Sequence, residues 1–169
     1  ERGNRLIVQP DVEAVDMGLA PEPFTAGELD TMADGSVFME MTRGCPYRCS
    51  YCFYSGKCRG VRERDFTILL AALEKRNRIS LHEIYILSPT FNGTPDFHSR
   101  LRALAAKNSG VRLHTEMLKE GIDETTPGML AKAGFRSLEV AIKTITTEAL
   151  KRVGRKGNAQ KAIAGMNTI

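Results

Sequence analysis

Three cysteines in a short stretch are the residues of this sequence best placed to do chemistry. Cys45, Cys49 and Cys52 follow one another at the spacing C-x3-C-x2-C, on a loop opened by glycine and proline. A fourth, Cys58, lies close behind, and the 169-residue chain has no other cysteine. So short a loop can bring three thiolates to one small volume, as a metal or iron–sulfur centre requires.

Three thiolates are one ligand short of an ordinary [4Fe–4S] cluster, which takes four. A loop with three therefore leaves one iron with an open coordination site, which a substrate or cofactor can occupy. We expect Cys58 not to be a ligand, because a fourth thiolate would fill that position.

Other interpretations of the cysteines stay open. A disulfide framework is disfavoured, because the short spacings hold the sulfurs in one turn and nothing signals secretion. Structural zinc would use all four cysteines, although such sites usually come as two separated pairs. A redox pair of Cys49 and Cys52 would assign no role to Cys45.

Four short strands separated by helices must position this loop. We expect strands at 37–42, 82–87, 111–116 and 137–142, and helices at about 65–76, from 94, at 127–133 and at 147–153. This alternation predicts repeated right-handed βαβ units and a parallel sheet. The fold class is α/β, and about four βα units make a partial parallel (β/α) barrel of TIM-like type.

The predicted strands carry polar residues on one face. In three of them an apolar face opposes a second face, which carries Phe38, Glu40 and Thr42 in the first strand, Arg112, His114 and Glu116 in the third, and Glu139, Ala141 and Lys143 in the fourth. Parallel sheets normally bury both faces, and a closed barrel is filled by apolar layers. A charged inner face therefore implies a lumen that holds a polar ligand. The alternative is a sheet with helices on one face and water on the other.

Residues 1–36 differ from the rest, with three prolines, four glycines and little periodicity. We interpret them as an extended lead-in or interdomain linker, and 37–169 as the N-terminal half of a barrel. A sheet that ends at its fourth strand leaves an open edge. We therefore expect the chain to be a fragment or to pair with another chain there.

Composition excludes several classes of protein. The chain is 42% apolar and 26% charged, as globular proteins are. No apolar run approaches the roughly 18 residues of a membrane span, and the N-terminus lacks the apolar stretch of a signal peptide. We expect a cytoplasmic protein with no membrane partner. The net charge of +4 alone does not argue for a polyanion partner.

The segment from Cys45 to Cys52 resembles the signature of the radical S-adenosylmethionine (SAM) enzymes. Its Tyr51 places an aromatic residue before the last cysteine, and the motif follows the first predicted barrel strand. The segments 43–46, 86–91 and 121–135 resemble the branch that usually carries a cobalamin-binding domain ahead of the barrel. The resemblance runs from about Val37 to the C-terminus.

The resemblance implies a site. Cys45, Cys49 and Cys52 would be the metal ligands of a [4Fe–4S] cluster, whose remaining iron would bind the amino and carboxylate groups of SAM. The cofactor-binding residues that it implies are Tyr51 near the adenine, Ser88 and Thr90 at the methionine amino group, and Glu116 toward the ribose or sulfonium. It implies no particular catalytic residue.

The resemblance also implies an activity. The family cleaves SAM reductively to a 5′-deoxyadenosyl radical, which abstracts hydrogen from a small-molecule or peptide substrate. The expected type is a cobalamin-dependent C-methyltransferase, with cobalamin held by a domain outside this chain. An electron donor such as flavodoxin or ferredoxin would be a partner.

The family pattern is not matched everywhere. Residues 141–144 replace a Gly-x-Gln-Ser or Gly-x-Gln-Thr stretch, which puts Lys143 beside the expected cofactor, and Ser88 stands where an acidic residue often precedes the proline. Phe53 and Tyr54 are expected to shield the cluster from solvent.

Two rival functions remain. One is a tRNA-modifying radical SAM enzyme, in which a C-terminal basic cluster would meet phosphates. The other is a non-catalytic iron–sulfur or zinc-binding module. We interpret the basic cluster as a solvated helix end and expect no nucleic-acid partner, because no aromatic residues interleave with it. Its members are Lys151, Arg152, Arg155, Lys156 and Lys161.

Overall fold

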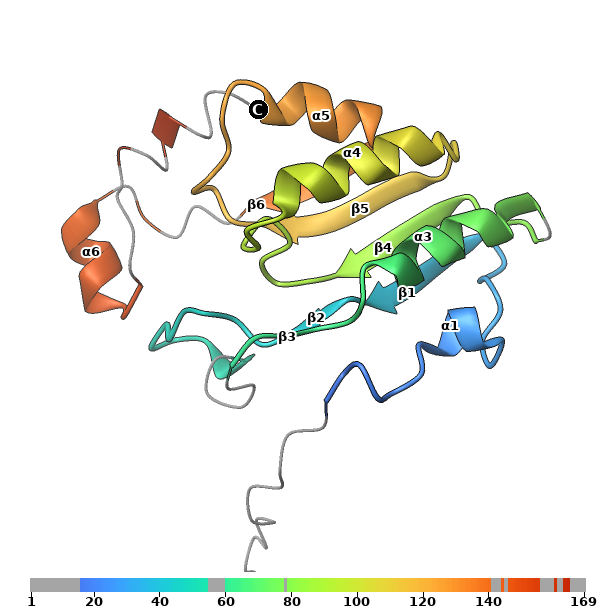
Figure 1. Ribbon diagram of the computed structural model, residues 1–169. Coiled ribbons are helices and arrows are strands. Elements are labelled where there is room, and N and C mark those ends of the chain that lie inside the picture. Colours follow the sequence, from blue (N-terminus) through green and yellow to red (C-terminus); the bar gives the residue numbers. More distant parts are fainter. Residues whose placement is uncertain are drawn as a thin grey trace, which may run out of the picture.

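A four-stranded parallel sheet forms the centre of the computed structural model (Figure 1). Its strands, in spatial order, are β1 (Ser36–Glu40), β4 (Glu83–Leu87), β5 (Arg112–Met117) and β6 (Phe135–Val140). Every neighbouring pair is parallel, and the spatial order of the four strands is their order along the chain. This confirms the predicted α/β class and the partial (β/α) barrel. The residues described are 16–54, 60–77, 79–140, 144, 146–155, 160 and 163–164.

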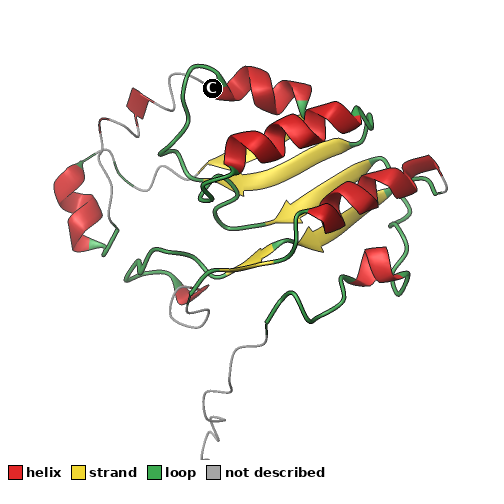
Figure 2. Cartoon of the chain, viewed as in Figure 1, coloured by secondary structure: helices red, strands yellow, loops and turns green. Residues whose placement is uncertain are grey.

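Three helices cover one face of this sheet (Figure 2). They are α3 (Thr67–Glu74), which continues as the short 3-10 helix η1 (Lys75–Asn77), α4 (Phe97–Lys107) and α5 (Thr126–Lys132). Their apolar stripes bury Leu69, Leu101 and Leu130 against the sheet residues Ile84 and Leu113. The crossover helices thus build the core and leave the other face of the sheet to polar and aromatic residues.

That second face carries a row of stacked rings at mid-strand. Phe38, Tyr85, His114 and Ser137 are register partners across the four strands. The rings of Phe38 and Tyr85 stack at 4.8 Å and those of Tyr85 and His114 at 4.4 Å. The imidazole Nδ1 of His114 lies 2.6 Å from the hydroxyl of Ser137. The predicted polar alternation is therefore present, with aromatic rings at its centre.

A bulge keeps β6 in phase with this pattern. Leu113 pairs with Phe135 but His114 pairs with Ser137, which leaves Arg136 as an extra residue. Leu138 therefore packs against the core, and the strand begins two residues before the predicted Ser137. The predicted end of this strand at residues 141–142, and Lys143 beyond it, lie outside the described residues.

The first predicted strand is too long at its end. β1 stops at Glu40, and Thr42–Arg43 forms β2, which pairs antiparallel with β3 (Arg62–Glu63) in a second, two-stranded sheet. The chain leaves the main sheet because the backbone carbonyl of Met41 accepts a hydrogen bond from the N–H of Arg64. The β2–β3 pair joins the two ends of the cysteine-containing segment.

The described part of the lead-in packs onto the molecule. Helix α1 (Pro23–Ala26) buries Phe24 in the core, and the ammonium group of Lys75 donates to the carbonyls of Phe24 at 2.9 Å and Thr25 at 2.8 Å. The guanidinium of Arg64 donates to the carbonyl of Met17 at 3.1 Å. The role of residues 1–36 as an interdomain linker stays a prediction. Among the described helices, none is long and apolar enough to cross a bilayer.

Asp123 organises the start of α5 and generates a pH-dependent prediction. Its carboxylate accepts hydrogen bonds from the hydroxyls of Thr125 and Thr126 and from their backbone N–H groups. These hydrogen bonds lower the pKa of Asp123 from 3.8 to about 2. Because the native pKa is depressed, the stabilisation is complete above the unfolded pKa and is lost as the pH falls through the native value.

Between about pH 4 and about pH 2, we expect the free energy of unfolding to fall less steeply in Asp123→Asn than in the wild type. The amide oxygen still accepts hydrogen bonds, but the side chain has no proton to take up in this range. Chemical denaturation at several pH values measures this slope. Glu124→Gln removes a neighbouring exposed carboxylate and serves as the control. An acid slope in Asp123→Asn equal to that of the wild type would contradict the assignment.

Candidate functional site

A cavity of about 500 Å³ opens at the carboxyl ends of the parallel strands. This is the edge at which parallel α/β sheets and barrels bind their ligands. The structure brings together the residues that the resemblance implied as cluster ligands and as SAM-binding residues. Cys45, Cys49, Tyr51, Cys52, Ser88, Thr90 and Glu116 line this cavity.

The segment that carries the cysteines begins at a glycine. Gly44 has φ +97°, and a Cβ atom there would lie 1.6 Å from the carbonyl oxygen of Gly60. Its N–H donates to the hydroxyl of Tyr54 at 2.7 Å, so both ends of the loop 44–54 are tied together. Only a residue without a side chain allows the two backbones to approach this closely.

The three thiols surround part of the cavity without meeting at one point. All three are half-buried, and no disulfide joins them to one another among the residues that the structure describes. No group of three potential ligands among the described residues is placed to hold a single metal ion. Because each thiolate of a cluster binds a different iron, a [4Fe–4S] ligand set has to border a volume instead.

Electrostatics at Cys45 reflect this half-buried position. Burial raises the pKa of the Cys45 thiol, whereas a hydrogen bond from the N–H of Tyr47 and the charge of Arg155 act in the opposite direction. The N–H of Cys52 donates to the carbonyl of Cys49 at 3.0 Å and closes the turn between the last two cysteines. The backbone of the loop thus fixes the turn that joins Cys49 to Cys52.

Ser88, in the loop after β4, presents a polar atom with an unmet hydrogen-bonding capacity. Its side chain is 1% exposed, and its hydroxyl has no hydrogen-bond partner among the described residues. Asn92 fixes this loop to the one after β5, because its amide donates to the carbonyl of Leu118 at 2.8 Å and its oxygen accepts from the Leu118 N–H at 2.7 Å. A buried hydroxyl without a partner fits a ligand that brings its own donor.

Carboxylates form the wall of the cavity nearest the sheet. Glu40 is the last residue of β1, Glu116 and Glu139 are the next-to-last residues of β5 and β6, and Glu116 pairs in register with Glu139. The pKa of Glu40 is lowered, chiefly by its hydrogen bond to Arg43. Sequence reasoning selected only Glu116, although the other two carry the same signal of a polar residue at a strand end. This wall is complementary to a cationic ligand.

Arg155 is a cavity residue that sequence reasoning missed. It is 5% exposed, its guanidinium lies 4.7 Å from the centre of the Tyr47 ring, and it pairs with the carboxylate of Glu120 at 3.2 Å. The interpretation of this residue as part of a solvated helix end is therefore wrong. No local signal marks it, because its partners lie far away in the sequence.

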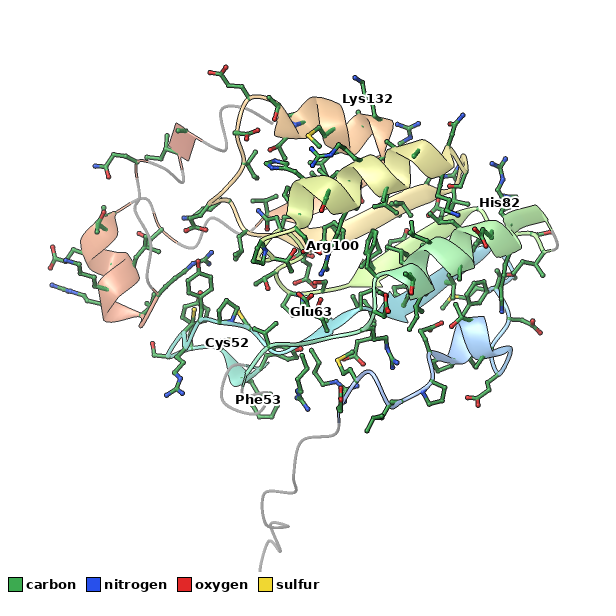
Figure 3. All side chains as sticks on the ribbon, viewed as in Figure 1. Cys52, Phe53, Glu63, His82, Arg100 and Lys132 are labelled. Atoms are coloured by element: carbon green, nitrogen blue, oxygen red, sulfur yellow. The ribbon has the colours of Figure 1, made fainter. Side chains whose placement is uncertain are left out.

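The residues after the last cysteine divide between two sides of the loop. Tyr54 lines the cavity, whereas Phe53 is 81% exposed and does not. Figure 3 shows Cys52 turned toward the sheet and Phe53 turned away from it. The expectation that Phe53 shields the cysteines is therefore wrong. Cys58, Lys156 and Lys161 lie outside the described residues.

Comparison with known proteins places this geometry in context. Residues 39–169 match the family profile described as the Radical SAM superfamily. The chain is 24% identical over 147 residues to the ribosomal protein uS12 methylthiotransferase RimO of Ralstonia nicotianae, an alignment that covers 75% of this chain and 32% of that protein. The chain thus spans about a third of the length of this curated relative.

Solved structures of similar fold point the same way. The radical S-adenosylmethionine methyltransferase TsrM of Kitasatospora setae, with tryptophan and a SAM analogue bound, has a TM-score of 0.66 at 19% identity, over 80% of this chain and 28% of that one. The cobalamin-dependent S-adenosylmethionine radical enzyme OxsB has a TM-score of 0.67 at 20% identity, over 92% and 25%. These similarities show the fold.

The close approach at Gly44 generates a prediction with a matched control. We expect Gly44→Ala to reduce iron and sulfide incorporation on anaerobic reconstitution by about tenfold or more, because the new Cβ atom must displace the Gly60 carbonyl. Gly60→Ala has a similar positive φ of +73° but no atom within 4 Å of its Cβ, so it should retain most of the metal. Iron and sulfide assays on both variants, with circular dichroism to verify folding, provide the measurement. Equal incorporation in the two variants would contradict the steric argument.

Proposed function

The chain belongs to the radical SAM superfamily, and from this premise we propose that Cys45, Cys49 and Cys52 bind the [4Fe–4S] cluster that the family uses, with SAM in the same cavity. The observation that carries the proposal is the shared lining: three half-buried thiols and the buried, unpartnered hydroxyl of Ser88 border one volume. The donor set fits, because three thiolates leave one iron open to the amino and carboxylate groups of SAM.

The side chains of the cavity complement the charges of SAM. The hydroxyl of Ser88 can accept a hydrogen bond from the methionine ammonium group, and Thr90 lies buried in the same loop. Glu116 and Glu139 face the region where the ribose and the sulfonium would lie. Tyr51 borders the cavity and offers a ring for the adenine to pack on. These residues orient the ligand, and the carboxylates offset its positive charge.

When bound, the reduced cluster would supply the electron for the reductive cleavage of SAM to methionine and a 5′-deoxyadenosyl radical, and that radical would take a hydrogen atom from the substrate. The chain's own contribution would be to hold and orient SAM at the carboxyl ends of the strands. The stacked rings of Phe38, Tyr85 and His114 precede the carboxylate layer on the same sheet face. A substrate would therefore lie above these rings.

The finer reaction that we propose is cobalamin-dependent methyl transfer to carbon. TsrM, also solved with cobalamin and a [4Fe–4S] cluster bound, and OxsB share this fold and support the proposal. The cobalamin would be held by a domain outside these 169 residues and would supply the methyl group.

The cysteines test the proposed ligand set. After anaerobic reconstitution and reduction with dithionite, we expect the wild-type chain to release 5′-deoxyadenosine from SAM. Serine at Cys45, Cys49 or Cys52 should reduce cluster content and product to background, because each change removes one ligand. Cys58→Ser is the matched control and should keep both. Loss of the cluster in Cys58→Ser, or product formation by the other three variants, would contradict the assignment.

Methyl transfer has a separate test in the longest form of the protein that expresses. With SAM carrying a deuterated methyl group and a panel of candidate acceptors, we expect the label to appear on a carbon atom of the product only when cobalamin is added. Mass spectrometry detects the label. Labelled product without cobalamin, or the labelled methyl group bound through sulfur, would contradict the finer proposal while leaving radical SAM chemistry intact.

A further inference from the structure

Positive charge is concentrated in two segments of the sequence. Residues 41–62, which contain the cysteine motif, hold five basic and no acidic residues, and so do residues 150–169. The whole chain has a net charge of only +4, so the remainder is acidic on balance. Arg43, Arg152 and Arg155 are paired with carboxylates of other segments, so any local positive field comes mainly from the other cations of the two segments.

The fold brings these two segments together. Helix α6 (Thr147–Arg152) is followed by Val153, whose carbonyl accepts a hydrogen bond from the N–H of Ser50 at 2.9 Å. A Cβ atom on Gly154 would lie 2.5 Å from the carbonyl oxygen of Arg48, which shows how closely the two backbones pack. Figure 1 shows α6 on the side of the sheet where the cysteine loop lies.

The cations at this junction face solvent. Arg48 and Lys151 are exposed, and neither has an ion-pair partner among the described residues. Arg152 is exposed as well and pairs with Glu148 at 2.7 Å on the surface of the helix. An exposed pair of this kind is weak, so it leaves Arg152 able to meet another anion.

Two aromatic side chains lie on the same loop. Tyr51 is 54% exposed and Phe53 is 81% exposed, on either side of Cys52 in the sequence. Cys52 turns inward and Phe53 outward (Figure 3). Exposed aromatic rings with a rim of basic residues are typical of protein interfaces. We call this set the loop–α6 surface, and its members are Arg48, Tyr51, Phe53, Lys151 and Arg152.

We infer that the loop–α6 surface docks a small electron-transfer protein with an acidic face around its redox group. The inference rests on the proposed function, which needs one electron from outside for each SAM cleaved. In docking, the reduced flavin or cluster of the donor loses one electron and the [4Fe–4S] cluster gains it, with no bond made or broken. The surface suits this role because Tyr51 and Phe53 are the sequence neighbours of Cys52, a proposed cluster ligand. A donor protein bound to these rings would therefore lie close to the cluster.

Charge complementarity favours an acidic protein over RNA. A transient electron-transfer contact needs only a small interface steered by opposite charges. The loop–α6 surface matches this pattern: a few cations around one strongly exposed apolar ring. Its aromatic rings are confined to the loop and do not alternate with the cations of α6, so they do not form a row on which successive bases could stack. The experiment below therefore includes RNA binding as the alternative outcome.

A charge-reversed double variant, Arg48→Glu with Lys151→Glu, tests the inference in reconstituted protein. Reduced flavodoxin is the probe, and bleaching of the cluster absorbance in stopped flow gives the second-order rate constant. We expect the rate constant to fall by about tenfold or more at low salt and to lose most of its salt dependence. Phe53→Ser should lower the rate constant while keeping the salt dependence, because it removes apolar contact and no charge.

The matched control reverses the same amount of charge elsewhere. Arg102→Glu with Lys132→Glu changes exposed residues of α4 and α5, on the helix-covered side of the sheet (Figure 3 labels Lys132). We expect this variant to keep most of the wild-type rate constant. A fall as large as that of the loop–α6 variant would show a general effect of net charge and would overturn the inference.

Dithionite separates this inference from the proposed function. All variants should release 5′-deoxyadenosine at wild-type yield when dithionite replaces flavodoxin, because a small reductant needs no docking surface. If wild-type protein with dithionite yields no product, the proposed function fails. If it does, and Arg48→Glu with Lys151→Glu leaves the flavodoxin rate constant unchanged, the docking surface alone is wrong. Salt-sensitive binding of bulk tRNA that this variant abolishes, with flavodoxin reduction unaffected, would assign the surface to RNA instead.

Discussion

The close backbone approach of Gly44 to Gly60 is the constraint on which the site depends. This contact closes the base of the cysteine loop beside the β2–β3 pair. The N–H of Gly44 also donates a hydrogen bond to the Tyr54 hydroxyl. A second anchor joins Ser50 to the segment after α6. Between these anchors, three thiols border a volume and leave one side of it to a ligand from outside the motif. In the proposed ligand set, this arrangement would leave one iron of the cluster open to SAM.

The sheet supplies the other half of the site because its two faces differ. One face is apolar and buried by α3, α4 and α5, so the strands are held in fixed register. The other carries stacked rings at mid-strand and carboxylates at the carboxyl ends, which face the cysteine loop across the cavity. A polar layer of this kind is stable only where a ligand or water satisfies it. The polar face predicted from the sequence thus borders the cavity in which we propose that the cofactor binds.

Much of this arrangement could be predicted from local signals. The cysteine spacing, the polar residue Glu116 near a strand end, and the alternation of strands and helices that indicates a parallel sheet follow from neighbouring residues. The structure places the cysteines and Glu116 at one edge of that sheet. Arg155 could not be predicted, because its partners Tyr47 and Glu120 are set by the return of the chain after α6. Phe53 was expected to be covered, but hydrophobicity alone does not tell which side of a loop a residue faces. The bulge at Arg136 could not be predicted either, because the alternation that begins at Ser137 is regular and gives no sign that Phe135, one phase away, belongs to the same strand.

The measurement that bears most directly on the account is the coordination of the open iron. Reconstituted, reduced protein would be mixed with SAM that carries an isotopically labelled amino nitrogen, and the hyperfine coupling between that nitrogen and the cluster spin would be recorded. We expect a hyperfine coupling between the labelled nitrogen and the cluster that is strong enough for direct coordination of the nitrogen to iron. The coupling should be present in Cys58→Ser and absent without SAM. A cluster whose irons all carry cysteine ligands, with no coupling to the label, would contradict it.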